Sequence, residues 1–239
     1  MRLVDKTLPR ESRLEQQTKP RGTEMSVTDD LTAQIRRAAA RLRDGAVVVY
    51  PTETFYGLGS LATRADALAR LAAAKLRPPG KPLPLVAADL AQVAEVASLA
   101  SPLARRLADR FWPGPLTLVL PAAAGLDSIL TGGTGTIAVR IPASEVARKL
   151  SEQAGGPLVS TSANLSGAPP PTRVAELSPE LLARVDVVLD GGRTPGGHPS
   201  TVVSIVSGVL ELIRAGAIPF QDVEAAAREA STGGPRHTF

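Results

Sequence analysis

The feature that most constrains the fold is the segment AVVVYPTETFYGLG at residues 46–59, where a run of β-branched residues stops at a proline. The three valines at 47–49 are typical of a strand buried on both faces, and Pro51 ends it because proline has no N–H to donate. In an open α/β sheet, ligands bind beyond the carboxyl ends of the strands. The Thr-Glu-Thr sequence at 52–54 therefore either faces a ligand or forms a plain turn in which threonine bonds its own backbone.

Composition narrows the class of protein. The chain has 239 residues, of which 44% are hydrophobic and 21% charged, as is typical of a globular α/β domain. The absence of cysteine excludes thiolate nucleophiles, zinc knuckles and disulfides. No apolar run reaches transmembrane length and the first residues lack the apolar core of a signal peptide, so we expect a cytoplasmic protein.

We predict one folded domain with disordered ends. Residues 1–27 are polar, contain two prolines and show no sustained apolar period, which predicts a disordered basic extension. The single domain is predicted at 28–230, followed by a disordered tail at 231–239. Net charge is +4, and the mildly basic body suits anionic ligands such as nucleotides.

The apolar periodicity of the body alternates between helices and strands, which indicates an α/β fold. Helices are predicted at about 28–44, 65–76, 90–100, 102–110 and 144–154, and from beyond Pro219 to about 230. Strands are predicted at 47–50, 83–87, 116–120, 137–141, 157–159, 185–189, 202–206 and 209–213.

A cationic cluster lies where the second predicted helix ends. Lys75 follows the apolar stripe of that helix, and Arg77 and Lys81 flank a Pro-Pro-Gly sequence. An ammonium at the end of a core-facing stripe must reach water or an anion, because burying it unpaired is unfavourable. The cluster either binds an anion or complements the negative end of the helix dipole.

Two further features point to an anionic ligand. Arg140 interrupts an otherwise apolar strand, where a guanidinium requires a carboxylate or phosphate partner. The sequence STSANLSG at 160–167 places four hydroxyls and an amide at a strand end, which favours a substrate site over a simple turn.

Other polar or aromatic segments are assigned structural roles. The glycine-rich sequence at 131–136 lacks the Gly-Lys-Ser/Thr of a P-loop, so a turn is expected. The Phe111-Trp112 corner could stack a base, but we expect it to fill space in the core. His198 has no convergent partners, so no zinc site is expected.

The order of these blocks resembles the YrdC/TsaC-type threonylcarbamoyl-AMP synthases. The blocks are YPTETFYGLG (50–59), KLRPPGKPL (75–83), FWPGPLTLVL (111–120), TIAVRIP (136–142), STSANLSG (160–167), DGGRTPGGHPSTVV (190–203) and IRAG (213–216). The resemblance covers the predicted body. It implies an open, twisted, mixed sheet that lines a large concave cavity and is flanked by helices.

The resemblance also implies a nucleotidyltransferase reaction. L-Threonine, bicarbonate and ATP would give threonylcarbamoyl-AMP and pyrophosphate, with Mg2+ held through phosphate oxygens and water. The product would pass to a separate transferase machinery that modifies an adenosine of certain tRNAs. The additional C-terminal domain of longer family members is not expected, because about twenty residues follow Gly216.

The same resemblance implies roles for individual residues. The catalytic cations would be Lys75 and Arg77; the threonine-binding residues would be Thr54, Arg140, Ser160 and Ser200; the nucleotide-binding residues would be Arg77, Lys81, Thr136, Ser162, Asn164 and Arg214. Lys81, Val86 and Pro170 depart from the longer members, which have asparagine, histidine and serine there. Replacing Lys75 or Arg77 with alanine is expected to lower turnover with little loss of stability.

Two alternatives belong to other classes. A non-catalytic module of the same fold could bind double-stranded RNA or a ribosomal element, although aromatic residues are only 3% and the body has no run of Lys and Arg. A carbamoyl-phosphate-handling domain is the other alternative. Pyrophosphate release that requires threonine, bicarbonate and ATP together separates the synthase from both.

Overall fold

The computed structural model describes residues 27–75 and 81–229. The predicted extension at 1–26, the tail from residue 230 and the catalytic candidate Arg77 lie outside the described residues. The described helices are α1 (Val27–Arg43), α2 (Ala65–Ala74), α3 (Leu90–Val96), α4 (Pro102–Phe111), α5 (Ser128–Thr131), α6 (Glu145–Ala154), α7 (Pro179–Leu182) and α8 (Phe220–Arg228), with 3-10 turns η1 (Val174–Glu176) and η2 (Val206–Gly208).

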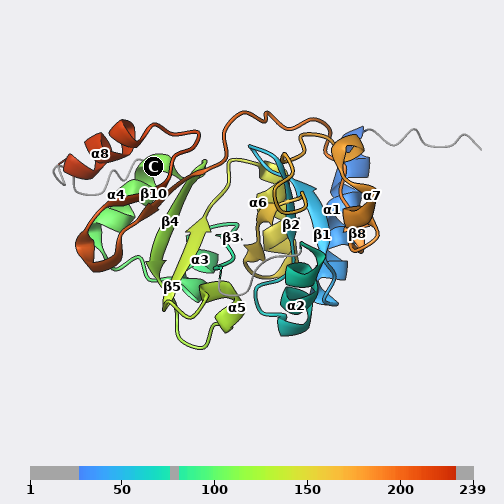
Figure 1. Cartoon of the computed structure of the whole chain (residues 1–239), viewed down its shortest axis with the longest axis horizontal. Helices are drawn as coiled ribbons and strands as arrows, with labels where there is room; N and C mark the ends of the chain where they lie inside the picture. The colour runs from blue at the N-terminus through green and yellow to red at the C-terminus, as the bar shows by residue number, and fades with distance from the viewer. Residues whose placement is uncertain (1–26, 76–80, 230–239) are drawn as a thin grey trace, which may run out of the picture.

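The strands form two mixed sheets (Figure 1). The first has the order β7-β2-β1-β8 and the second β10-β9-β4-β5-β3-β6. The strands are β1 (Val48–Pro51), β2 (Tyr56–Gly59), β3 (Leu85–Val86), β4 (Leu116–Pro121), β5 (Thr136–Arg140), β6 (Leu158–Val159), β7 (Thr161–Ser162), β8 (Val187–Val188), β9 (Thr201–Ser204) and β10 (Glu211–Arg214). Parallel pairs β1–β8, β3–β5 and β4–β9 alternate with antiparallel pairs, so the predicted mixed α/β architecture is confirmed.

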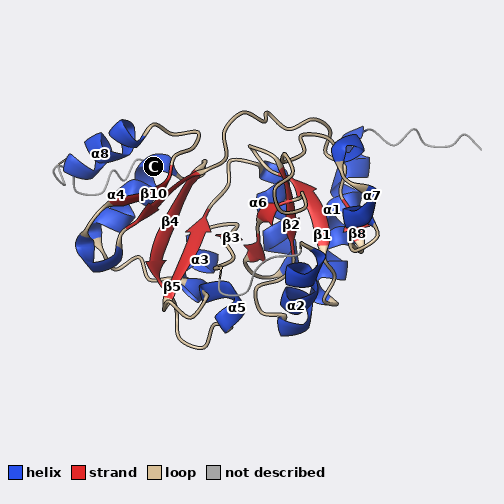
Figure 2. Cartoon of the chain, in the orientation of Figure 1, coloured by secondary structure: helices blue, strands red, loops and turns tan. Residues whose placement is uncertain are grey.

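Helices flank both groups of strands (Figure 2). Helix α1 packs against α6, which also contacts β1, and their buried side chains surround the fully buried Leu42 and Tyr50. The apolar stripe predicted for this helix is confirmed, since Ile35, Ala39 and Leu42 are buried. A larger core lies between the sheets and helices α2, α3, α4 and α8. Among the described residues, no helix has both the length and the apolar character needed to cross a bilayer.

One short segment belongs to both sheets. Leu158 and Val159 pair with β3 in the second sheet, and Thr161 and Ser162 pair with β2 in the first. The Val159 N–H also donates to the Ser60 carbonyl at 2.9 Å. The two sheets are therefore joined through residues 158–162, with Ser160 at the junction.

Several elements differ from the prediction. No strand was predicted for the YGLG sequence of β2, yet it forms one because β1 and β7 pair with its two edges. Helices α5 and α7 were not predicted, since four residues carry no helical period. The Trp112 prediction is confirmed: its ring packs against the large core and its indole N–H donates to the Leu116 carbonyl at 2.7 Å.

The junction between the sheets leaves no room for a side chain at Gly59. A Cβ there would lie 2.2 Å from the Val159 carbonyl oxygen and 2.8 Å from the Tyr50 ring. We therefore expect Gly59→Ala to lower the free energy of unfolding by about 1–3 kcal/mol, because backbone must move to accept the methyl group.

The matched control is Gly57→Ala, two residues earlier on the same strand. Its nearest neighbour would be the Tyr50 ring at 3.4 Å, an ordinary contact distance. Urea unfolding of both variants measures the difference. Equal losses of stability would contradict the close approach of β2 to Val159.

Candidate active site

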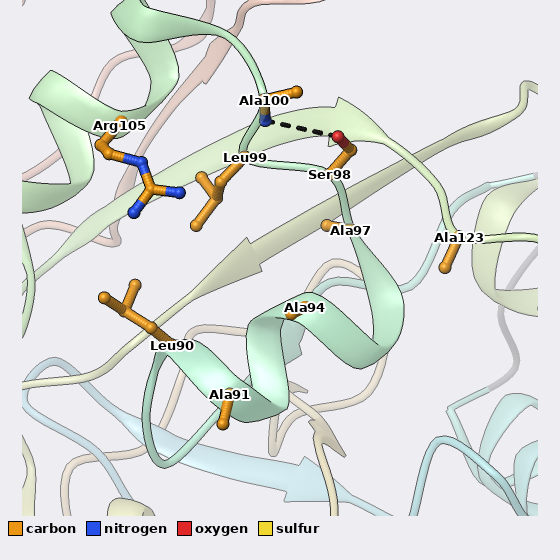
Figure 3. A pocket seen from close by; sticks show the side chains of 9 residues that line it. All are labelled: Leu90, Ala91, Ala94, Ala97, Ser98, Leu99, Ala100, Arg105 and Ala123. Carbon is orange, nitrogen blue, oxygen red and sulfur yellow. Dashed lines mark hydrogen bonds between the residues drawn. The ribbon is translucent and has the colours of Figure 1, made fainter.

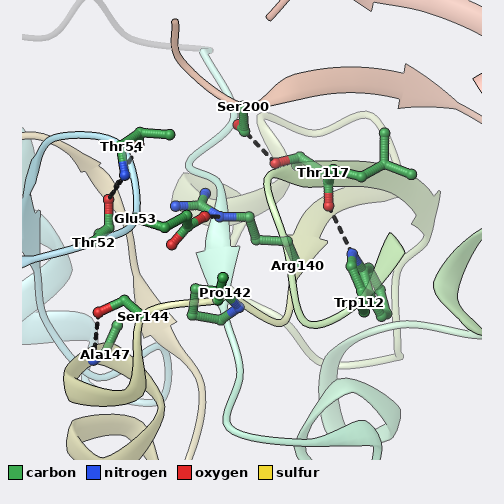
Figure 4. Close-up of polar contacts among 12 residues, drawn as sticks. Thr52, Glu53, Thr54, Trp112, Thr117, Arg140, Pro142, Ser144, Ala147 and Ser200 are labelled. Atoms are coloured by element: carbon green, nitrogen blue, oxygen red, sulfur yellow. Dashed lines mark hydrogen bonds and ion pairs between the residues drawn. The ribbon is translucent and has the colours of Figure 1, made fainter. Parts of the chain in front are cut away.

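A buried ion pair lies where strands of the two sheets end. Arg140 is the last residue of β5, and Glu53 lies in the turn that follows β1. The Arg140 Nε donates to the Glu53 Oε1 at 3.0 Å, and the two side chains are 6% and 11% exposed. Figure 4 shows the two side chains pointing toward each other. A carboxylate or phosphate partner was predicted for Arg140, and in the structure that partner is Glu53.

The turn that carries Glu53 is closed by Thr52. Its hydroxyl donates to the Phe55 carbonyl at 2.7 Å and accepts from the Thr54 N–H at 3.2 Å. Thr52 thus bonds its own backbone, as the simple-turn alternative supposed. Thr54 is buried, and its carbonyl accepts from the Gly196 N–H at 2.7 Å. The turn is held on the loop that connects β8 with β9.

A second guanidinium, that of Arg214, contacts Ser200. Arg214, at the end of β10, donates through Nη2 to the carbonyl and hydroxyl of Ser200 at 2.8 and 3.1 Å. Burial of part of the side chain, followed by the positive charge of Arg140, lowers the pKa of the Arg214 guanidinium from its ordinary value. The residue as a whole is exposed, so its charge is accessible to an anion, whereas Arg140 is buried.

Ser200 is fixed by a further hydroxyl. The Thr117 Oγ1, on β4, donates to the Ser200 Oγ at 2.9 Å. In Figure 4 the labelled side chains of Thr54, Arg140 and Ser200 lie around one region, and they come from three distant parts of the chain. The structure therefore brings together three of the residues predicted to bind threonine.

The fourth predicted threonine-binding residue is Ser160, whose Oγ and the Thr52 side chain both approach Gly57. Ser160 is buried at the junction of the sheets, and its backbone N–H donates to the Pro84 carbonyl at 2.8 Å. Burial raises the pKa of the neighbouring Tyr50 to about 12, while a hydrogen bond with the Ser160 side chain opposes that rise. Tyr50 remains a neutral phenol at physiological pH and anchors its hydroxyl on the Val159 carbonyl at 3.0 Å.

A second polar group surrounds Lys75. The Nζ of Lys75 lies within 3.2 Å of four oxygens, the carbonyl and side-chain oxygens of Ser162 and Asn164. The residue is only 6% exposed, and the Ser166 hydroxyl donates to its carbonyl at 3.1 Å. Lys75 therefore organises the loop at 162–166. Because its removal would leave several partly buried acceptors unpaired, we now expect alanine at this position to lower stability as well as turnover.

The other predicted site residues that the structure describes are Thr136 and Lys81. Thr136 begins β5 and its hydroxyl lies 2.8 Å from that of Thr134. Thr136 and Arg140 are four residues apart on one strand, so they share a face about 13 Å apart. Lys81 is exposed. Val86 pairs with Arg140 across β3 and β5 and is fully buried.

The sequence did not indicate individual roles for two residues of the site, Thr117 and Glu53. Thr117 carries the single hydroxyl in the strand sequence LTLVLP, and a lone hydroxyl in an apolar strand is the feature that could have indicated its role. Glu53 was noted only as one of three polar turn residues, because its partner lies 87 positions away.

A cavity among the described residues lies away from these polar groups (Figure 3). It measures about 580 Å3 beside α3 and is lined by Leu90, Ala91, Ala94, Ala97, Ser98, Leu99, Ala100, Arg105 and Ala123. None of the predicted site residues lines it. A cavity at Arg140 and Lys75 that accommodates an adenylated amino acid therefore stays a prediction. Across residues 27–75 and 81–229, no group of three or more His, Cys, Asp or Glu could hold a metal.

Comparisons with known proteins all indicate one family. The Sua5/YciO/YrdC family model, described as "Telomere recombination", matches residues 40–216. The threonylcarbamoyl-AMP synthase of Pyrococcus abyssi is 41% identical over 80% of this chain, and that of Halorhodospira halophila is 44% identical over 66%. The chain spans 56% of the Pyrococcus relative, 59% of a Bacillus subtilis relative and 83% of the Halorhodospira relative.

The fold leads to the same family. The crystal structure of P. abyssi Sua5 complexed with L-threonine superposes with a TM-score of 0.77 at 41% identity, covering 80% of this chain and 56% of that one. Escherichia coli YciO superposes with a TM-score of 0.69 at 29% identity, covering 76% of this chain and 88% of the other. From the matched residues, the similar relatives and the shared fold, this chain belongs to the Sua5/YciO/YrdC family.

Proposed function

We propose that this protein is an L-threonylcarbamoyladenylate synthase, which converts L-threonine, bicarbonate and ATP into threonylcarbamoyl-AMP and pyrophosphate. The observation that carries the proposal is that Thr54, Arg140 and Ser200 lie around one region at the ends of strands from both sheets, with Arg214 hydrogen-bonded to Ser200. This arrangement supplies guanidinium and hydroxyl donors for a small carboxylate. Relatives named threonylcarbamoyl-AMP synthase, and a relative crystallised with L-threonine, support the same substrate.

The chemistry needs positioning more than a protein nucleophile. The threonine ammonium first loses a proton, and the neutral amine then adds to bicarbonate and releases water, which gives a carbamate. A carbamate oxygen then attacks the α-phosphorus of ATP, and the bond to the β-phosphate oxygen breaks to release pyrophosphate. Such a displacement is accelerated by holding the reactants in line and by neutralising charge. The sequence contains no cysteine to provide a thiolate.

The polar group around Arg140 and the polar group around Lys75 bind different substrates. The Arg140 group binds the amino acid, and the loop ordered by Lys75 presents Ser162 and Asn164 to the nucleotide. Ser160 and Ser162 alternate along one extended segment, so they lie about 7 Å apart and link the two groups. Thr136, on the same face of β5 as Arg140, would contact the far part of the nucleotide. Arg77 and Lys81 would add positive charge beside Lys75.

We propose that Mg2+ enters with ATP. The oxygens of Ser162 and Asn164 are hard ligands of the kind that Mg2+ accepts, but they already surround the Lys75 ammonium. Phosphate oxygens and water would therefore hold the ion. Its chemical contribution would be to neutralise phosphate charge. The product would be consumed by a separate transferase that acts on tRNA.

The deciding experiment follows pyrophosphate release by the full chain. With threonine, bicarbonate, ATP and Mg2+ together we expect continuous release, and omission of any one substrate should abolish it. Release from ATP alone, or its absence from the complete mixture, would overturn the synthase assignment. Tight binding of double-stranded RNA without pyrophosphate release would favour the non-catalytic RNA-binding module.

Lys75→Ala tests the nucleotide half of the site. We expect kcat to fall by at least about 100-fold, because an ordered cation beside the nucleotide is lost. The free energy of unfolding should also fall, by about 1–3 kcal/mol, because the oxygens around Nζ lose their donor. Steady-state kinetics and urea unfolding measure the two effects.

The matched control for this lysine is Lys149→Ala. Lys149 is half exposed on α6 and forms an ion pair with the exposed Glu145. Its replacement should leave both quantities unchanged. Wild-type turnover in Lys75→Ala would remove Lys75 from the site.

Arg140→Lys tests the amino-acid half while it retains the positive charge opposite Glu53. Loss of the guanidinium fork should raise the KM for threonine by about 10- to 100-fold, since a lysine cannot hold a carboxylate through two parallel bonds. The KM for ATP should change far less. Equal increases in both constants would assign Arg140 a purely structural role.

A further inference from the structure

Glu53 has an oxygen that the folded chain does not use. Its Oε1 accepts the Nε of Arg140, whereas its Oε2 is buried and has no hydrogen-bond partner among the described residues. A buried carboxylate oxygen without a donor is strongly unfavourable. Such an atom inside a site indicates that a ligand supplies the missing donor.

Arg140 is also only partly used. Within residues 27–75 and 81–229, it donates a side-chain hydrogen bond only through Nε. Its two Nη groups donate no hydrogen bond among the same residues, and Figure 4 shows the side chains of Glu53 and Thr54 beside the Arg140 guanidinium. The ion pair therefore retains a double donor on Arg140 and a single acceptor on Glu53, side by side.

An α-amino acid carries the complementary pair of charges. Its carboxylate and its ammonium are attached to one carbon, so an arginine fork and a neighbouring carboxylate oxygen can bind both at once. A ligand with only a carboxylate would meet the attraction of Arg140 and the repulsion of Glu53 together. The terminal torsion of glutamate is soft, which allows Oε2 to turn toward a ligand while Arg140 stays in place.

We propose that Glu53 is a substrate-binding residue that accepts a hydrogen bond from the ammonium group of the amino acid and so restricts the site to zwitterions. The inference rests on the proposed function, because it assigns the amino acid to the Arg140 group. It adds a specificity rule: a 2-hydroxy acid of the same shape is rejected because it cannot donate from a cationic nitrogen.

Wild-type protein tests the rule without any substitution. Calorimetry in the presence of a non-hydrolysable ATP analogue compares L-threonine with 2,3-dihydroxybutanoate, which lacks the ammonium, and with threoninol, which lacks the carboxylate. We expect both analogues to bind at least about tenfold more weakly than threonine. Equal binding of threonine and the dihydroxy acid, or no binding of threonine, would overturn the proposal.

Glu53→Gln keeps the shape of the side chain and removes its charge. We expect threonine to bind at least about tenfold more weakly while the dihydroxy acid binds as well as before or better, so that the discrimination collapses. Affinity for the ATP analogue should stay unchanged. Equal weakening of threonine and the dihydroxy acid, or full retention of discrimination, would contradict an ammonium contact.

Controls separate this inference from the synthase assignment. Glu145→Gln removes an exposed glutamate on α6 and should change no affinity. Thermal unfolding checks that Glu53→Gln folds, and if it does not, the wild-type ligand comparison decides alone. If the protein discriminates threonine from the dihydroxy acid but releases no pyrophosphate, the synthase assignment is overturned and the ammonium contact stands. If it releases pyrophosphate but does not discriminate between the two ligands, the ammonium contact is overturned and the synthase assignment stands.

Discussion

The structure depends on a buried ion pair that lies where strands of the two sheets end. Arg140 and Glu53 are both nearly buried, and each would be strongly unfavourable alone. Their contact therefore fixes the turn after β1 against the last residue of β5. Because β1 and β5 belong to different sheets, this ion pair adds a second connection between the sheets to the one at residues 158–162.

Apolar periodicity predicted most of the helices and strands, because it reflects which face of each single element is buried. The strands at β1, β4 and β5 and the helices α2, α4 and α6 follow from apolar periods and from capping residues such as Ser101 and Ser144, whose side chains accept backbone N–H groups. β2 was missed as a strand because YGLG has little strand preference, and its pairing on both edges outweighs that preference.

The site was predicted residue by residue but not as a set of contacts. The resemblance named Lys75, Ser162 and Asn164, yet their mutual hydrogen bonds depend on how the end of α2 meets the loop after β7. Likewise, nothing local relates Glu53 to Arg140. Such pairs depend on strand order, which apolar periodicity does not encode. The residues that a pattern can find are those whose side chain is unusual in its own segment.

The segment at 158–162 contributes edges to both sheets, and this has a consequence for how the protein loses its structure. Moving one sheet away from the other would break pairs with β3 or with β2, because only Ser160 lies between the residues that make them. The halves therefore do not behave as autonomous lobes. Heating should melt them in one cooperative step, with calorimetric and van't Hoff enthalpies that agree.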